Sequence, residues 1–134
     1  MKYKIILIVP AMALLTMILA ISNLTQFAMA FSVFTDNPTN GTINLPSVSV
    51  SVDSIGAGHI VGEVTNRGTQ PATFMEIIAT FYNSQNLVIG TDNTFTNPST
   101  VSPGQANPFD LIFAYNDGMT ISQIDHVKLH LDWR

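Results

Sequence analysis

The sequence predicts an all-β protein, an antiparallel β-sandwich of about seven strands. Between His59 and Phe113, short apolar stretches alternate with polar turns that are rich in glycine, proline and asparagine. Short strands at intervals of roughly 8–12 residues, with no convincing helix between them, are typical of sandwiches and barrels. A hydrophobic signal or anchor helix is predicted to precede the sandwich, within residues 1–30.

The first 30 residues have the parts of a signal peptide. Lys2 and Lys4 precede an apolar run over Ile5–Ile21, and a more polar tail ends in Ala28-Met29-Ala30. This order predicts cleavage after Ala30, and the alternative is an uncleaved membrane anchor. The lysines should stay in the cytoplasm in both cases. We therefore expect the remaining chain to be extracytoplasmic, either secreted or anchored to the cell membrane.

The charge of the exported part excludes several kinds of partner. Three basic and nine acidic side chains follow residue 30, which gives a net charge of −6. Binding to nucleic acid needs clustered Lys and Arg, so we expect no nucleic-acid partner. Attachment to an anionic membrane surface is disfavoured for the same reason, which leaves residues 1–30, if uncleaved, as the only membrane contact.

The chain contains no cysteine. Disulfides, thiol catalysis and thiolate zinc sites are therefore excluded. The 104 residues after Ala30 are enough for one domain of ordinary size. That length suits an immunoglobulin-like sandwich without the cysteine pair of antibody domains.

Turn-forming residues dominate 31–46, which predicts a linker, although Phe31, Val33 and Phe34 would also suit a short strand. We place the sandwich domain at 47–134. Its first strand is expected at Ser47–Val52, where serine and valine alternate without a break.

The next strand contains Gly62 between Ile60 and Val64, on what should be the buried face. A glycine inside a strand indicates a close neighbour or a bulge. Phe74–Tyr82 is the longest strand candidate, and its β-branched and aromatic content favours a strand over a helix. Leu87–Ile89 should pair back against it as a hairpin.

The later strands are predicted at Thr94–Thr96, at Phe109–Tyr115 and over His126–Trp133. The last of these is the clearest, because apolar and polar residues alternate throughout. Its apolar face consists of Val127, Leu129, Leu131 and Trp133.

Five segments occur in the order and spacing of a known family. They are Ile60–Asn66 with Gly68, Ala79–Asn83, Leu87–Gly90, Val101–Gln105 and Pro108–Phe109. This series resembles the FxLYD family of small prokaryotic extracytoplasmic domains, over about residues 47–133. The family usually has Asp where this chain has Asn83, and both residues suit a turn. The resemblance implies an immunoglobulin-like sandwich, secreted or held at the envelope, with no catalytic residues to transfer.

The candidate binding residues are Phe74, Ile78 and Tyr82, which should share the outer face of the longest strand. Exposed apolar patches tend to mark partner surfaces. No arrangement of Ser, His and Asp, paired carboxylates or glycine-rich loop indicates catalysis, and no cofactor is expected. We therefore expect a non-catalytic module, binding or structural, whose partner is an envelope protein or a glycan.

The alternative function is an extracytoplasmic copper or zinc protein that uses His59, His126 and His130. His126 and His130 should lie about 13 Å apart on one strand face at ~3.3 Å per residue, too far to share one ion. Lys128 between them would repel a cation. Separately, Asn40-Gly41-Thr42 is a candidate N-glycosylation sequon at Asn40.

Overall fold

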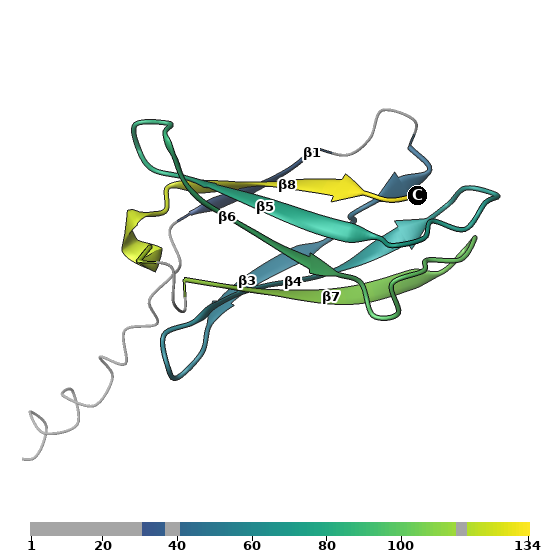
Figure 1. The fold of residues 1–134 in the computed structure, drawn as a ribbon, viewed down its shortest axis with the longest axis horizontal. Coiled ribbons are helices and arrows are strands. Elements are labelled where there is room, and N and C mark those ends of the chain that lie inside the picture. The colour runs from purple at the N-terminus through teal and green to yellow at the C-terminus, as the bar shows by residue number, and fades with distance from the viewer. Residues whose placement is uncertain (1–30, 37–40, 115–117) are drawn as a thin grey trace, which may run out of the picture.

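The computed structural model describes residues 31–36, 41–114 and 118–134. These residues form an all-β sandwich of two sheets, with one short 3-10 turn, η1 (Ile121–Gln123), before the last strand. Figure 1 shows the two layers, with β8, β5 and β6 above β3, β4 and β7. No helix in the described part of the chain is long and apolar enough to span a membrane.

Sheet A has the strand order β1 (Ser32–Asp36), β8 (His126–Asp132), β5 (Glu76–Tyr82) and β6 (Val88–Phe95). The β5–β6 and β5–β8 pairs are antiparallel, whereas β1 runs parallel to β8. The sheet is therefore mixed, and the expectation of a wholly antiparallel sandwich was wrong at this pair.

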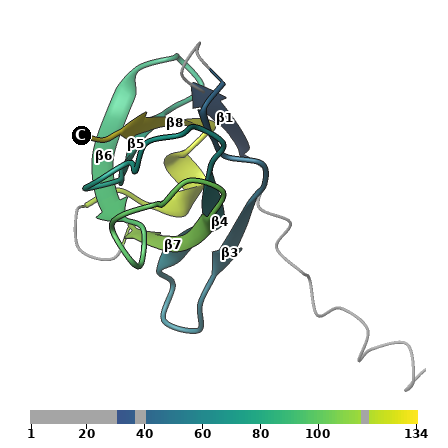
Figure 2. The ribbon, with the colours of Figure 1, turned by 90° about the vertical axis from the view of Figure 1, so that its right-hand side faces the viewer.

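Sheet B is arranged around β4 (Gly58–Asn66). β7 (Ala106–Phe113) pairs along one side of β4, while β3 (Val48–Val52) and the two-residue β2 (Ile43–Asn44) pair along the other. All pairs in this sheet are antiparallel. In Figure 2, β1 and β3 lie on one side of the sandwich and β6 lies on the other.

The prediction of a linker over residues 31–46 was wrong. Ser32–Asp36 form β1 and Ile43–Asn44 form β2, and the side chains of Ile43 and Leu45 are buried in the core. A strand that pairs with β8 and side chains that complete the core belong to the sandwich. The folded unit among the described residues therefore includes Phe31, which packs against Phe113, and does not begin near Pro46.

Alternation of side chains builds the core. Sheet B contributes Ile60, Val64, Leu111 and Phe113, and sheet A contributes Ile77, Ala79, Phe81, Val127, Leu129 and Leu131. Phe81 and Phe113 join the two layers, because their ring centroids lie 4.8 Å apart. Burial of this kind is the main favourable term in folding.

The prediction of a close neighbour at Gly62 is confirmed. A Cβ atom at Gly62 would lie 2.8 Å from the carbonyl oxygen of Ser47 and 2.9 Å from the ring of Phe109. Glycine therefore lets β4 approach both neighbours.

Strand boundaries differ from the expectation in several places, and β7 begins at Ala106 rather than at the predicted Phe109. β5 begins at Glu76, because Phe74 has a left-handed backbone with φ of 51° and lies in the preceding loop. β6 is continuous over Val88–Phe95, whereas the sequence indicated two shorter strands at Leu87–Ile89 and Thr94–Thr96.

Candidate binding face

The outer surface of sheet A carries exposed aromatic and polar side chains from all four strands. Alternation directs every second residue outward, and the pairing of the strands sets these residues side by side. We call this surface the sheet A face. It comprises Phe34, Glu76, Ile78, Thr80, Tyr82, Val88, Thr91, Asn93, Phe95, His126, Lys128, His130 and Asp132.

A row of three rings crosses one end of the sheet A face. Tyr82 is paired in register with His126, and their rings stack with centroids 4.7 Å apart. Phe34 meets the other side of His126 edge-on at 5.8 Å. Lys128 places its Nζ atom 5.2 Å from the centre of the Tyr82 ring, within the range of a cation–π interaction. We call these three rings the aromatic row.

The same end of the face bears uncovered apolar groups. Phe34 is 53% exposed and Val88 is 57% exposed. The Nδ1 atom of His126 lies 2.9 Å from a carboxylate oxygen of Asp125, which fixes the orientation of the ring. The aromatic row is thus a rigid surface that is open to solvent along one side.

The opposite end of the face has a shallow hollow of about 220 Å³. Its lining consists of Phe74, Glu76, Phe95, Asp132, Trp133 and Arg134. The guanidinium of Arg134 lies 5.7 Å from the centre of the Phe74 ring, and Phe95 is 46% exposed. Rings, carboxylates and one cation therefore meet at this end.

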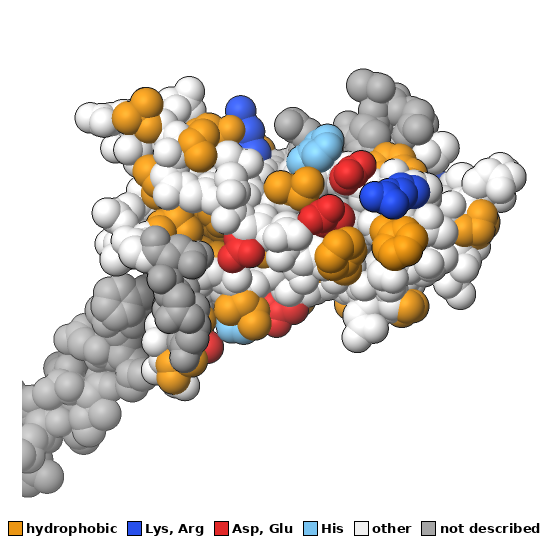
Figure 3. All heavy atoms as spheres, viewed as in Figure 1, with side chains coloured by type: hydrophobic (Ala, Val, Ile, Leu, Met, Phe, Trp, Pro, Cys, Tyr) orange, Lys and Arg blue, Asp and Glu red, His pale blue; other side chains and the backbone are white. Residues whose placement is uncertain are grey.

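The middle of the sheet A face is polar. A second hollow is lined by Glu76, Ile78, Thr91, Asp92 and Asn93, and the side-chain amide of Asn93 donates a hydrogen bond to Glu76. Figure 3 shows acidic and hydrophobic side chains interleaved over the molecule, with a basic group over a hydrophobic one. The sheet A face therefore has hydrogen-bonding groups in its middle and aromatic side chains at both ends.

The three predicted binding residues fall at different points of this surface. Tyr82 belongs to the aromatic row, and Ile78 lies half-buried in the middle. Phe74 lies outside β5, at the hollow, and is 62% exposed. The structure therefore places all three along one face without bringing their side chains together.

Sequence reasoning missed Phe34, Phe95 and His126 as parts of this surface. Phe34 fell in the predicted linker, and Phe95 fell in the short strand predicted at Thr94–Thr96, whose outward face was not considered as a binding surface. The alternation over His126–Asp132 was a usable signal for His126, since it placed that ring on the outer face. Its stacking partner depends on strand register, which the pattern does not contain.

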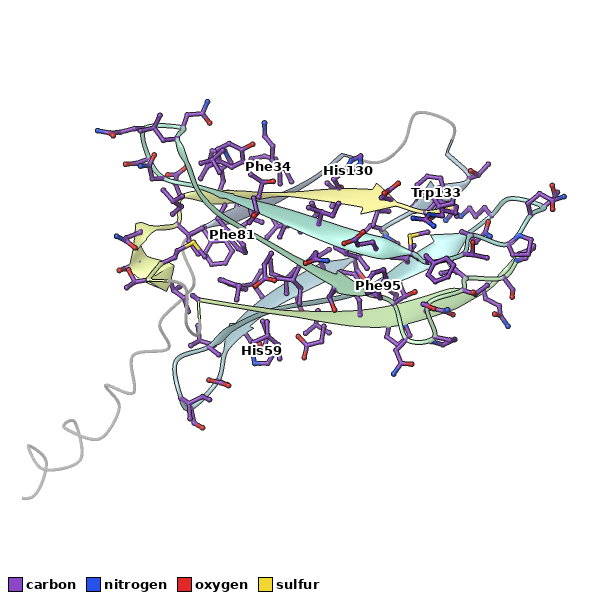
Figure 4. The ribbon with its side chains drawn as sticks, viewed as in Figure 1. Phe34, His59, Phe81, Phe95, His130 and Trp133 are labelled. Atoms are coloured by element: carbon purple, nitrogen blue, oxygen red, sulfur yellow. The ribbon has the colours of Figure 1, made fainter. Side chains whose placement is uncertain are left out.

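The three histidines of the metal hypothesis lie on two separate surfaces. His126 and His130 project from β8 on the sheet A face, whereas His59 projects from β4 on the outer face of sheet B. Figure 4 shows His130 above the sandwich and His59 below it. Within the described ranges no group of three or more His, Asp or Glu side chains could hold a metal ion. The structure does not bring the predicted ligands together.

His59 instead lies between two carboxylates. Its Nδ1 atom is 3.0 Å from Asp110 on β7, and its Nε2 atom is 3.5 Å from Asp53 in the β3–β4 turn. The hydrogen bond with Asp110 is the main cause that raises the pKa of His59, and Asp53 adds to it against the opposing effect of desolvation. A protonated His59 would donate to both carboxylates and tie the turn to β7.

Asp53 also organises the turn itself. Its side chain accepts hydrogen bonds from the backbone N–H groups of Ile55 and Ala57. Desolvation is the largest single effect on this carboxyl and opposes its ionisation. The two backbone donors together with His59 nevertheless hold the pKa of Asp53 below its ordinary value.

Two expectations lie outside the described residues. The signal or anchor helix falls within residues 1–30, and Asn40 falls within 37–40.

Comparison with known proteins gives limited information. No family model matches the chain, and no curated protein matches it. The crystal structure of Campylobacter jejuni cj0090 is similar over 77% of this chain and 98% of that chain, at 10% sequence identity and a TM-score of 0.44. A similarity at this level carries no argument about function.

Proposed function

We propose that this chain is an exported, non-catalytic module of the cell envelope that binds a protein or glycan partner through the sheet A face. The observation that carries the proposal is the distribution of rings on that face, with the aromatic row at one end and Phe74 and Phe95 at the other. Rigid aromatic side chains supply a large contact area at low entropic cost, which makes them the usual anchors of interfaces.

Export is supported by the sequence of residues 1–30, with lysines before an apolar run and Ala28-Met29-Ala30 after it. A cleaved signal peptide and an uncleaved anchor both leave the sandwich outside the cytoplasm. The negative charge of the exported part also fits a role away from nucleic acids.

We further propose that the sandwich is an immunoglobulin-like domain of the FxLYD type. In immunoglobulin domains, strands B and E pair in one sheet and strands C and F pair in the other. The pairs β4–β7 and β5–β8 follow the same scheme when β3 to β5 are taken as A to C and β7 and β8 as E and F. The segments that resemble the FxLYD family contain turns between these strands.

The test compares single truncations on the two outer faces. Tagged full-length protein is used to capture partners from envelope extracts, either as wild type or as Phe34→Ala or Phe95→Ala. Ile112→Ala is the matched control, because Ile112 is as exposed as Phe34 at 53% but lies on the outer face of sheet B. We expect capture to fall at least ~10-fold for one or both phenylalanine variants, as for an interface anchor, and to be unchanged for Ile112→Ala.

Equal capture by all three variants would place the binding surface elsewhere. Absence of any specific partner, for wild type as well, would contradict the binding function itself. Thermal unfolding of each variant separates loss of binding from loss of folding.

A further inference from the structure

The exposed side of β3 offers unpaired backbone groups. The backbone N–H of Asp53 donates to Ala57 at 2.9 Å, which makes these two residues a hydrogen-bonded pair. Because such pairs alternate along an antiparallel ladder, Ser51 and Ser49 also bond to β4. The N–H and C=O groups of Val48, Val50 and Val52 must then point away from β4.

The β4–β7 side of sheet B supports the same assignment. The backbone N–H of Asn66 donates to Gln105, so the even-numbered residues of β4 direct their hydrogen bonds toward β7. The odd-numbered His59 and Val61 are left for β3. Among the described residues, no segment pairs with the open side of β3. We call this side the β3 edge.

Exposed strand edges tend to pair with other chains, and proteins protect them with charges, prolines or bulges. β7 contains Pro108, whose carbonyl also accepts from Asn97. β6 has a register shift beside Tyr82 and carries Asp92 opposite the buried Ala79. β1, at the other edge of sheet A from β6, contains Asp36. β3 alone of these four strands has no charge, proline or bulge within its five residues.

The sequence of β3 is complementary to itself. In an antiparallel pairing centred on Val50, the Val50 residues of the two copies face each other. Val48 of each copy faces Val52 of the other, which makes three hydrogen-bonded pairs in all. Centring the pairing on Ser49 or Ser51 instead leaves two such pairs between the valines of β3. The alternating pattern therefore favours one register.

Acidic groups on the β3 segment itself are kept apart in this pairing, although the exported part of the chain has a net charge of −6. The nearest acid on this segment is Asp53, which the register about Val50 places opposite the partner's Ser47. The two copies of Asp53 then lie at opposite ends of the strand pair, about 20 Å apart at ~3.3 Å per residue. That separation exceeds the Debye length of about 8 Å at physiological salt.

We propose that two copies of this chain associate through their β3 edges, antiparallel about a two-fold axis at Val50, so that sheet B continues across both protomers. A two-fold interface of this kind uses the β3 edge of both copies, so the assembly closes at two. The contact is a single short strand, which is small beside a standard interface. The dimer is therefore expected to be weak and reversible and to form at high local concentration.

Engineered cysteines test both the contact and its register, because the natural chain has no cysteine. Ser49 and Ser51 are exposed on the outer face of β3. In the proposed register Ser49 faces the partner's Ser51 as a non-hydrogen-bonded pair, with Cα atoms about 4.5 Å apart. A disulfide spans that distance. Like residues would be about 8 Å apart, which a disulfide does not span.

Full-length Ser49→Cys and Ser51→Cys proteins with different tags are co-expressed, treated with diamide as the oxidant and separated on non-reducing gels. We expect a mixed Ser49→Cys/Ser51→Cys dimer at a yield at least ~10-fold above that of either variant alone. Efficient coupling of one variant with itself would overturn the axis at Val50. Absence of every cross-link would overturn the association, and cross-linked species larger than a dimer would overturn its closure.

The substitution Val50→Pro provides a second test of the contact. The N–H of Val50 is not used in the ladder with β4, so Val50→Pro keeps the intrachain bonds and removes the central bonds between copies. Thr91→Pro is the matched control on β6. The N–H of Thr96 donates to Met75, so the backbone groups of the even-numbered residues of β6 bond to β5. The N–H of Thr91 therefore points away from β5. We expect Val50→Pro to lower the cross-link yield at least ~10-fold and Thr91→Pro to leave it unchanged. Equal yields from the two would contradict the proposal.

Discussion

Asn66 is a buried polar side chain that fixes the turn after β4. It is 1% exposed, and its amide donates to the carbonyl oxygens of Gln70 and Val101 and accepts from the N–H of Gly68. The side chain therefore joins the turn after β4, through Gly68 and Gln70, to the backbone of Val101. Such a group is costly to remove because its partners remain buried.

We predict that Asn66→Ala lowers the free energy of unfolding by roughly 2–4 kcal/mol, since three backbone groups lose their partner. Asn93→Ala is the control on an exposed position and should change stability by less than about 0.5 kcal/mol. Urea unfolding monitored by circular dichroism measures both. Equal midpoints for the two variants would show that the turn does not depend on this amide.

His59 gives the stability of the fold a pH dependence. The carboxylate of Asp110, followed by that of Asp53, raises the pKa of His59 above its ordinary value of 6.5. The folded state thus holds the proton more tightly than the unfolded state does. The stability from this contact is fully present below pH 6.5 and is lost as pH rises through the folded-state pKa, which lies above that value.

The prediction is tested with His59→Gln, which keeps a polar side chain and removes the titration. The stability advantage of wild type over His59→Gln should decrease as pH is raised across this window. Chemical denaturation at several pH values on either side of it gives the difference. An advantage that stays constant or grows with pH would reverse the sign and contradict the assignment.

At the scale of elements, β4 is the strand on which sheet B depends. It pairs with β2, β3 and β7, and at Gly62 the carbonyl oxygen of Ser47 and the ring of Phe109 leave no room for a Cβ atom. Gly62→Ala would press a methyl group against the carbonyl of Ser47 and the ring of Phe109, which is buried.

We predict that Gly62→Ala destabilises the protein by about 1–3 kcal/mol, the range for overpacking. The smaller entropy of the unfolded alanine variant offsets only about 0.4–1 kcal/mol. Glu63→Ala, at the next residue and on the outer face, should stay within about 0.5 kcal/mol. Differential scanning calorimetry compares the two, and an unchanged melting temperature for Gly62→Ala would mean that the strands can move apart.

Elements with a regular pattern could be predicted from the sequence, and elements without one could not. Alternation located β3 and β8, because their burial follows the two-residue period. β1 and β2 were assigned to a linker. β2 has only two residues, and β1 is followed directly by turn-forming residues. The partner of β1 is β8, which lies far away in the sequence, so no local sequence pattern indicates the pairing.

For the whole molecule, the two-sheet fold was predictable and the layout of its surface was not. The sequence indicated that Tyr82 and His126 both face outward, but their stacking depends on the register between β5 and β8. Phe74 lies apart from Tyr82 because its left-handed backbone places it before β5, and the three histidines lie on two faces because β4 and β8 belong to different sheets. Periodicity reports which face a side chain takes, whereas register decides which side chains meet.

The parallel pair of β1 and β8 has a consequence for the order of folding. Val33 lies beside Val127, and β8 is also the strand that connects β1 to β5. During synthesis β1 leaves the ribosome before the other described strands and must wait for nearly the whole domain before its partner β8 is made. Contacts between residues so distant in sequence slow folding and prolong the time for which strands are unpaired. Completion of sheet A is therefore expected to be a late step, one that holds the earliest and latest parts of the domain together.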